Sequence, residues 1–304
     1  MKKARVKIPT QGKKEKSRRA AKEHFMSFKL GVNIGQGFGE SFHEGVLSTA
    51  RAGFDACFTG WSDGTDVAAR AAFIRENGLI YQSIHAPFNK SDALWEEGEA
   101  GDAFADLLVR CLHDCAENEI PIMVVHPIIG MDKHTPTPKG IERFARVVGE
   151  AEKTAVKVAF ENVEGIEYLR AVIKELGGSP AVGYCWDTGH EMCYNFSSDV
   201  PALFGDKLVA THLNDNFGMA DRNVVTWLDD SHMMPYDGIA DWQGIAKRLV
   251  RAGYEGILTF ELTSRSKPGK NTHDAYAAMG LDGFLDLAYS RAVRVAEEVE
   301  SARK

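Results

Sequence analysis

The sequence predicts one closed barrel of eight parallel β-strands, each followed by an α-helix: a (β/α)8 fold of the α/β class. Short apolar runs alternate with longer amphipathic stretches from residue 28 onward. The apolar runs are nearly continuous in hydrophobicity, as in parallel strands that are covered on both faces. Residues of metal-binding type stand at the ends of six runs. We therefore expect a single domain at 28–304.

The apolar runs are rich in Val, Ile, Phe and Leu and place the strands in order along the chain. They are expected at 28–34, 54–58, 79–85, 120–126, 156–161, 182–187, 208–213 and 257–261. Between them, apolar residues recur at three- and four-residue spacing. This spacing predicts helices at 68–77, 104–117, 140–153, 166–176, 242–252 and 283–298.

Capping residues support these helix ends. Glycines at left-handed C-terminal caps are expected at 53, 78, 177 and 253, and N-terminal caps at Ser41, Asp63 and Thr65. A doubly wound open sheet is the alternative fold, but the sequence has no Gly-x-Gly-x-x-Gly turn and no phosphate-binding lysine loop. Trp186 precedes an acidic strand end, so strand alternation should turn it toward the helix layer.

A basic segment at 1–27 precedes the barrel, and we expect it to be a flexible extension. It holds ten lysines and arginines against two glutamates, so its net charge is +8. The remaining residues then carry a net charge of −15, which gives the total of −7. An anionic body is a poor match for the phosphate backbone of nucleic acid. Nucleic acid is therefore not the expected partner, and the tail is an extension without an assigned role.

The cysteine content and the apolar runs bear on location. Five cysteines at 57, 111, 115, 185 and 193 make an odd count in a long chain, which indicates buried thiols in a reducing compartment. No apolar run is long enough to span a bilayer, and no signal-peptide core follows the basic segment. We expect a cytoplasmic protein that does not bind membranes.

The polar strand ends are the strongest indication of function. The six residues of this kind are His85, His126, Glu161, Asp187, His212 and Glu261. In a barrel of this type the carboxyl ends of all strands meet on one face, where active sites lie. A mixed oxygen and nitrogen shell suits Mn²⁺, Zn²⁺, Co²⁺ or Fe²⁺. Further candidates are His190, three residues after Asp187, and the pair Asp230 and His232 in a long segment at 214–241.

The ordered motifs resemble the xylose-isomerase-like superfamily of TIM barrels, which includes sugar isomerases, sugar epimerases and the endonuclease IV family. The motifs are ENVEG at 161–165, CWDTGH at 185–190, HLND at 212–215, DSH at 230–232, PYDGIADW at 235–242 and FEL at 260–262. The resemblance covers nearly everything from about Met26 to the C-terminus. It implies the TIM-barrel fold and a metal-dependent enzyme.

By resemblance to the single-metal members, four residues would bind one divalent ion: Glu161, Asp187, His212 and Glu261. The ion would be Mn²⁺, with Zn²⁺, Co²⁺, Mg²⁺ or Fe²⁺ as alternatives. The two glutamates would accept and donate the proton next to a sugar carbonyl, through a metal-stabilised enediolate. Glu167 and His190 hold the spacings of substrate-binding residues in the 3-epimerases. The arginine that those enzymes place six residues after the histidine ligand is Gly218 here.

Two further functions remain alternatives. The endonuclease IV family binds three metals, and its nine ligands would fall on His85, His126, Glu161, Asp187, His190, His212, Asp230, His232 and Glu261. CWDTGHEMCYN nevertheless lacks the cysteine of the nuclease signature after Asp-Thr, and 214–222 lacks its lysine-rich run. The other alternative is a metal-dependent lyase subunit, a dehydratase or C-glycoside-cleaving enzyme, that works with a small partner chain. The expected partners are a sugar substrate and either further copies of the chain or that small subunit.

Overall fold

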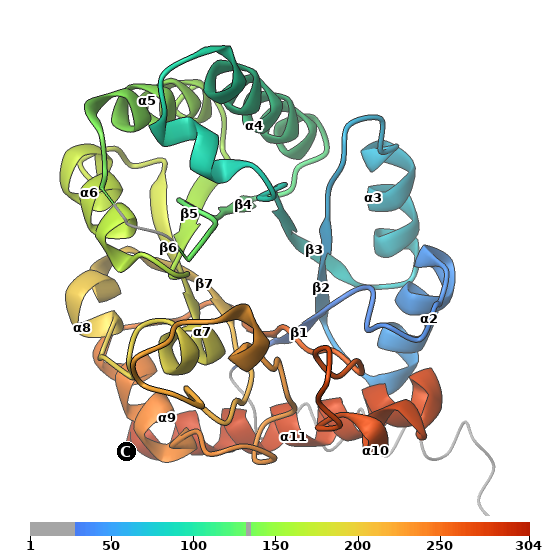
Figure 1. Ribbon diagram of the computed structural model, residues 1–304. Helices are drawn as coiled ribbons and strands as arrows, with labels where there is room; N and C mark the ends of the chain where they lie inside the picture. The colour runs from blue at the N-terminus through green and yellow to red at the C-terminus, as the bar shows by residue number, and fades with distance from the viewer. Residues whose placement is uncertain (1–27, 132–134) are drawn as a thin grey trace, which may run out of the picture.

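The computed structural model describes residues 28–131 and 135–304, and these form an eight-stranded parallel barrel surrounded by helices (Figure 1). The predicted basic extension at 1–27 lies outside the described residues. The strands are β1 Leu30–Asn33, β2 Ala56–Gly60, β3 Ile80–His85, β4 Ile122–Val125, β5 Lys157–Glu161, β6 Val182–Asp187, β7 Leu208–His212 and β8 Leu258–Phe260. All eight predicted strands are therefore confirmed.

The sheet order is β7-β6-β5-β4-β3-β2-β1-β8, with every named pair parallel. The barrel closes between β7 and β8 through a bridge from Leu213 to Phe260. Leu213 N–H donates to the Thr259 carbonyl at 2.8 Å, and Glu261 N–H donates to the Leu213 carbonyl at 3.2 Å. Closure leaves no open edge, so the carboxyl ends of all strands surround one mouth.

Helices follow the strands and form the outer layer, and α11 runs along the outside near β1 and β8 (Figure 1). The longer helices are α2 Phe42–Ala52, α3 Val67–Glu76, α4 Glu99–Glu117, α5 Pro138–Ala151, α6 Ile166–Leu176, α9 Trp242–Arg251 and α11 Gly280–Ala302. The shorter ones are α7 Thr188–Cys193, α8 Pro201–Phe204 and α10 Asp274–Ala277, with 3₁₀ turns η1 Ser91–Trp95, η2 Gly205–Lys207 and η3 Trp227–Asp229. The six predicted helices are present; α6 has the predicted bounds, and the other five have shifted ends.

Three of the seven predicted capping residues are wrong, and the other four are right. Ser41 forms a capping box with Glu44 at the start of α2. The cap of α3 is Asp66, which accepts from Ala69 N–H, rather than Asp63 or Thr65. Glycines 53, 78 and 253 have left-handed backbones. Gly177 instead stays right-handed, because its N–H continues the helix by donating to the Ile173 carbonyl at 2.9 Å.

The core has two parts, which lie on opposite faces of the sheet. The larger part fills the space between strands and helices. Trp186 belongs to it and is fully buried, which confirms its predicted orientation toward the helix layer. The smaller part lies on the other face of β4 to β7 and consists of Ile122, Val124, Ala159, Cys185 and Ala210. Three of these side chains are small, those of Ala159, Cys185 and Ala210. The polar residues two positions further along the same strands lie on the same face, at the mouth.

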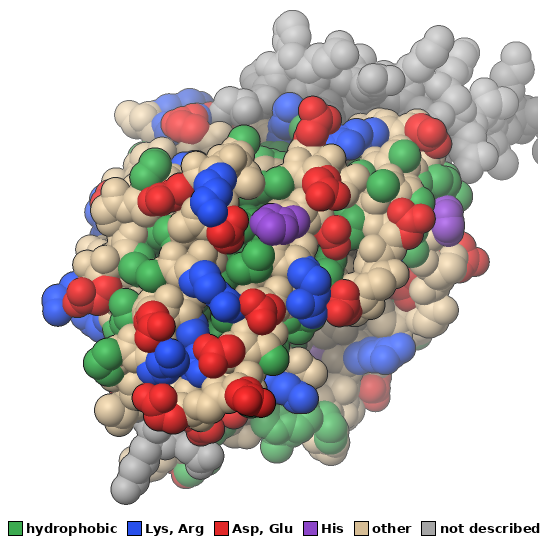
Figure 2. All heavy atoms as spheres, turned by 90° about the horizontal axis from the view of Figure 1, so that it is seen from above, with side chains coloured by type: hydrophobic (Ala, Val, Ile, Leu, Met, Phe, Trp, Pro, Cys, Tyr) green, Lys and Arg blue, Asp and Glu red, His purple; other side chains and the backbone are tan. Residues whose placement is uncertain are grey.

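All five cysteines are buried and free, as expected for structural thiols. Among the described residues, no helix is both long and apolar enough to cross a membrane. Figure 2 shows basic and acidic side chains interspersed on the face that it presents, without a continuous basic stripe among the described residues of that face.

Candidate metal centre at the barrel mouth

The structure brings the six predicted strand-end residues to one mouth. His85, Glu161, Asp187 and His212 are the last residues of β3, β5, β6 and β7. His126 and Glu261 directly follow β4 and β8. The pairing register aligns neighbouring ends, since Asp187 pairs with His212 and Glu161 pairs with Cys185.

Four of these residues form a central group. One ligand atom from each of Glu161, Asp187, His212 and Glu261 lies within 4.8 Å of the others. His212 Nδ1 is 2.8 Å from Glu161 Oε1 and 3.1 Å from Glu261 Oε2. Glu161 and Asp187 are fully buried. Three carboxylates this close would repel one another in a buried site, and a divalent cation would offset that cost. The donor set therefore fits a divalent metal ion.

The ionisation of the central group follows from burial and from its imidazole. Burial alone would raise the pKa of Glu261, but the neighbouring His212 lowers it to about 2. Burial likewise opposes ionisation of Glu161, and contacts with His212, His126 and His85 hold its pKa well below the usual value. Both glutamates are ionised at neutral pH, so either can ligate a cation or accept a proton.

Asp187 is held in place by neutral donors. Its Oδ1 accepts from His190 N–H at 2.7 Å, which caps α7, and Asn214 Nδ2 donates to both carboxylate oxygens at 3.1 and 2.9 Å. Asn162 Oδ1 accepts from Asp187 N–H at 2.9 Å. Burial raises the pKa of Asp187 to about 6. The two asparagines belong to the motifs ENVEG and HLND, but the motifs alone do not assign them this role.

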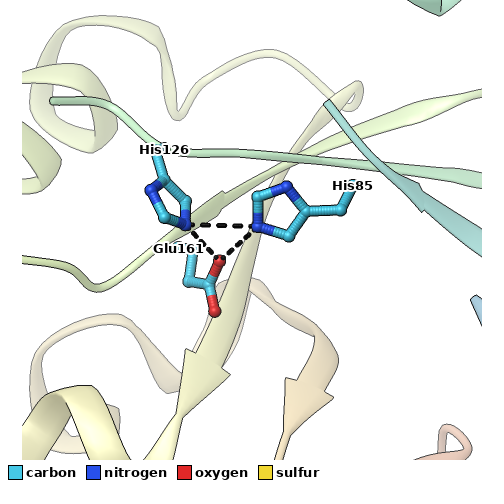
Figure 3. A group of neighbouring side chains, drawn as sticks. All are labelled: His85, His126 and Glu161. Carbon is cyan, nitrogen blue, oxygen red and sulfur yellow. Dashed lines mark hydrogen bonds and ion pairs between the residues drawn. The ribbon is translucent and has the colours of Figure 1, made fainter. Parts of the chain in front are cut away.

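A second group adjoins the first through Glu161 (Figure 3). Its Oε2 lies 3.1 Å from His126 Nε2 and 3.3 Å from His85 Nε2, and the two nitrogens are 3.2 Å apart. His85 Nδ1 lies 2.8 Å from the Ala86 carbonyl and donates to it, which leaves Nε2 facing Glu161 and His126. Burial lowers the pKa of His126 to about 4, which keeps it neutral. This group also has the donors of a metal site.

Of the remaining three candidates, Asp230 and His232 lie on a loop and His190 lies on α7. Asp230 is 3.1 Å from His232 Nε2 and 3.7 Å from His190 Nε2. Burial would lower the pKa of His232, but Asp230 raises it to about 9. A residue without a sequence assignment also contacts this carboxylate: Lys267 Nζ lies 3.3 Å from Asp230 Oδ2.

Asp215 holds the long loop at 213–241 against the barrel. Its carboxylate accepts hydrogen bonds from Tyr236 N–H, Ala240 N–H and the Trp242 indole, at 2.9, 2.9 and 3.0 Å. Its backbone forms an antiparallel bridge with Met233. These bonds fold the loop back over the mouth and place Asp230 and His232 beside α7.

A cavity of about 470 Å³ opens above these groups. His85, His126, His190, Asp230, His232 and Glu261 line it, together with Phe88, Ile129, Gly130, Met131, Glu164, Tyr194, Trp227 and Lys267. Glu167 is exposed on the first turn of α6, and the glutamate that lines the cavity from this segment is Glu164. Glu164 accepts from Gly130 N–H at 2.6 Å. The aromatic residue Trp95 does not line this cavity; it is buried and packs against Tyr168.

The chain matches the family model of the xylose isomerase-like TIM barrel across residues 47–281. The uncharacterized protein y4fM of Sinorhizobium fredii is 32% identical over 164 residues, covering 54% of this chain and 45% of that protein. The uncharacterized protein MJ1311 of Methanocaldococcus jannaschii is 24% identical over 226 residues, covering 66% and 69%. The match thus spans less than half the length of the first relative.

Solved structures with a similar fold include sugar 3-epimerases. L-ribulose 3-epimerase has a TM-score of 0.68 at 18% identity, with 91% of this chain and 96% of that chain covered. D-psicose 3-epimerase from Clostridium cellulolyticum H10, solved with D-tagatose, has a TM-score of 0.65 at 16% identity, with 89% and 99% covered. At these identities the similarity establishes the fold.

Proposed function

Since the chain belongs to the xylose isomerase-like TIM-barrel family, we propose that it is a divalent-metal-dependent isomerase or epimerase of a sugar or sugar derivative. The observation that carries the proposal is the central group, in which Glu161 and Glu261 flank His212 beside Asp187, with Glu261 also lining the cavity. The sugar 3-epimerase structures of the same fold support it.

The chain's own residues have the properties that proton transfer at a sugar carbon needs. A proton next to a carbonyl is weakly acidic, so its removal needs a base within hydrogen-bond reach and stabilisation of the negative charge that develops on oxygen. The bound ion, Mn²⁺ in our proposal, would supply that stabilisation. Glu161 and Glu261 reach the group from different strands and are both ionised. One accepts the proton, and the other returns it to the same carbon or to its neighbour.

The cavity walls suit a sugar. Phe88, Tyr194 and Trp227 offer aromatic faces for the apolar side of a sugar, and Glu164 and His190 offer groups that bind hydroxyls. His190 Nδ1 is engaged with the Asn162 carbonyl at 3.0 Å, which directs its Nε2 toward Asp230 on the cavity wall. His190 therefore keeps its predicted role in the proposal, and Glu164 takes the one assigned to Glu167.

Solvent exchange tests the proposal. The full chain, loaded with Mn²⁺, is incubated in D₂O with a panel of ketoses and their phosphates, and NMR follows the carbon-bound protons. We expect loss of one proton signal next to the carbonyl of at least one sugar, dependent on added metal. The absence of exchange with every sugar, in protein whose metal content has been measured, would contradict the proposed reaction.

One observation favours a second candidate, a phosphodiester hydrolase. The group His85–His126–Glu161 adjoins the central group, so two ions could share Glu161 as in a multi-metal nuclease. The anionic body and the interspersed charges of Figure 2 weigh against a nucleic acid substrate. Nicking of a duplex with an abasic site, without any sugar exchange, would favour the hydrolase.

A further inference from the structure

Lys267 is the cavity residue that the sequence motifs leave without a role. It lies in the loop after β8, with its side chain 21% exposed. Its Nζ is 3.3 Å from Asp230 Oδ2 and 5.5 Å from the centre of the Trp227 ring. In the described lining of the cavity it is the one lysine or arginine. Its position is therefore set by an ion pair and a cation–π contact, and it points at a residue of ligand type.

Asp230 is a buried carboxylate that lies beside two histidines of metal-ligand type. His190 and His232 both lie beside it, at 3.7 and 3.1 Å. Among the described residues, four groups of side chains could hold a metal ion. The group that contains His190 and His232 takes its carboxylate from Asp187, and none of the four contains Asp230. Asp187 already belongs to the central group. Asp230 is therefore the one carboxylate that belongs to the outer trio of Asp230, His190 and His232 alone, and Lys267 is paired with it.

We propose that Lys267 neutralises the charge of Asp230 and thereby excludes a metal ion from the outer trio. An ammonium group at 3.3 Å already neutralises the carboxylate, and a divalent ion on the same carboxylate would face a like charge at short range. An ion at His190 and His232 would then have to share Asp187 with the central group, so we expect metal only in the central group and beside His85 and His126. The inference rests on the proposed metal binding, and it separates this chain from a three-metal nuclease by a residue that lies outside the nine ligand positions.

Metal counting tests the inference without any substrate. The untagged full chain is stripped of metal and dialysed to equilibrium against Zn²⁺, and bound zinc per chain is measured by mass spectrometry. Lys267→Met removes the cation and is expected to bind one more Zn²⁺ per chain than the unsubstituted protein. Lys267→Arg keeps the charge and should bind the same number as the unsubstituted protein. Lys270→Met, at an exposed lysine of the same loop, is the matched control and should leave the count unchanged.

A double variant locates the additional ion. Lys267→Met with Asp230→Asn should return to the unsubstituted count, because the carboxylate that binds the ion is gone. Equal zinc in the unsubstituted protein and in Lys267→Met, three ions in the unsubstituted protein, or a gain that persists without Asp230 would each overturn the inference. If the unsubstituted protein binds no zinc, the proposed function fails. A gain of one ion at Asp230 in Lys267→Met would support the inference even then, whereas zinc in neither protein would overturn both.

Discussion

Glu161, Asp187 and His212 are positioned by the register of the parallel sheet, whereas Asp230, His232 and Lys267 are positioned by loops. The first three end adjacent strands, and Asp187 and His212 are directly paired. The loop residues depend on specific contacts instead. His232 has a left-handed backbone with φ of 48°, which a non-glycine residue adopts only when its surroundings hold it there.

This difference assigns separate tasks to the two sets. A sheet register leaves little freedom, so strand-end ligands suit a cation that requires fixed geometry. Loops can change without disturbing the barrel, so their residues suit the selection of substrate and of ion number. The strand-end residues therefore form a rigid part of the site, which we call the floor, and the loop residues form a part that can vary, which we call the wall.

Glu161→Gln should have the largest effect, because Glu161 belongs to both strand-end groups. The amide cannot accept the substrate proton and is a weaker metal ligand. We expect sugar proton exchange to fall about 100- to 10,000-fold and bound metal to be lost. NMR exchange rates and elemental analysis measure the two effects. Glu167→Gln, at an exposed glutamate, is the matched control. Full metal occupancy in Glu161→Gln would show that Glu161 is not a metal ligand.

Asp215→Ala should have the next largest effect and should be confined to the wall. The fully buried carboxylate accepts four hydrogen bonds, from Asn216, Tyr236 and Ala240 N–H and from the Trp242 indole. Unsatisfied buried donors cost about 1–3 kcal/mol each, so we expect the loop at 213–241 to lose about 3 kcal/mol of local stability. Hydrogen exchange read by mass spectrometry should show faster exchange there.

The strand-end group should respond differently to the same substitution. Asp215→Ala is expected to retain metal in the central group, because β5, β6 and β7 remain paired. Asp221→Ala, at an exposed aspartate of the same loop whose carboxylate accepts from the backbone and side chain of Asn223, is the control and should leave exchange unchanged. Loss of metal in Asp215→Ala together with an intact barrel would show that the loop also holds the floor.

The same contrast explains what the sequence could predict. Eight apolar runs of strand length predict the barrel, and residues of metal-ligand type at the ends of six of them predict the mouth, so six residues of the site follow from the pattern alone. Glu164 and Glu167 show where pattern stops. Spacing along the chain favours Glu167, but Gly165 turns the backbone with φ of 68° before α6 begins. That turn leaves Glu164 on the cavity and Glu167 on the exposed side of the helix.

Lys267 could not be predicted for a related reason. The residues after β8 have no strand or helix periodicity, and nothing in their composition indicates which of several lysines and arginines returns to the mouth. Its position arises from contacts with Asp230 and Trp227, which are over 35 residues away in the chain. Only the folded loops bring these residues together. The asparagines around Asp187, in contrast, are visible in their motifs, but their hydrogen bonds are not.

Phe88→Ala should have the smallest effect of those considered, and it tests whether the wall contacts substrate. The ring is 40% exposed, stacks on His126 with centroids 4.5 Å apart, and lines both this cavity and an adjacent one of about 570 Å³. Aromatic contacts contribute about 0.5–1.5 kcal/mol, so KM for the exchanging sugar should rise about 3- to 10-fold. Steady-state kinetics should show kcat nearly unchanged, since the glutamates and their register are untouched.

Phe217→Ala, at an aromatic residue of similar exposure that lines neither cavity, is the control. An equal fall in kcat with constant KM would instead make Phe88 a support of His126, and would place it with the floor.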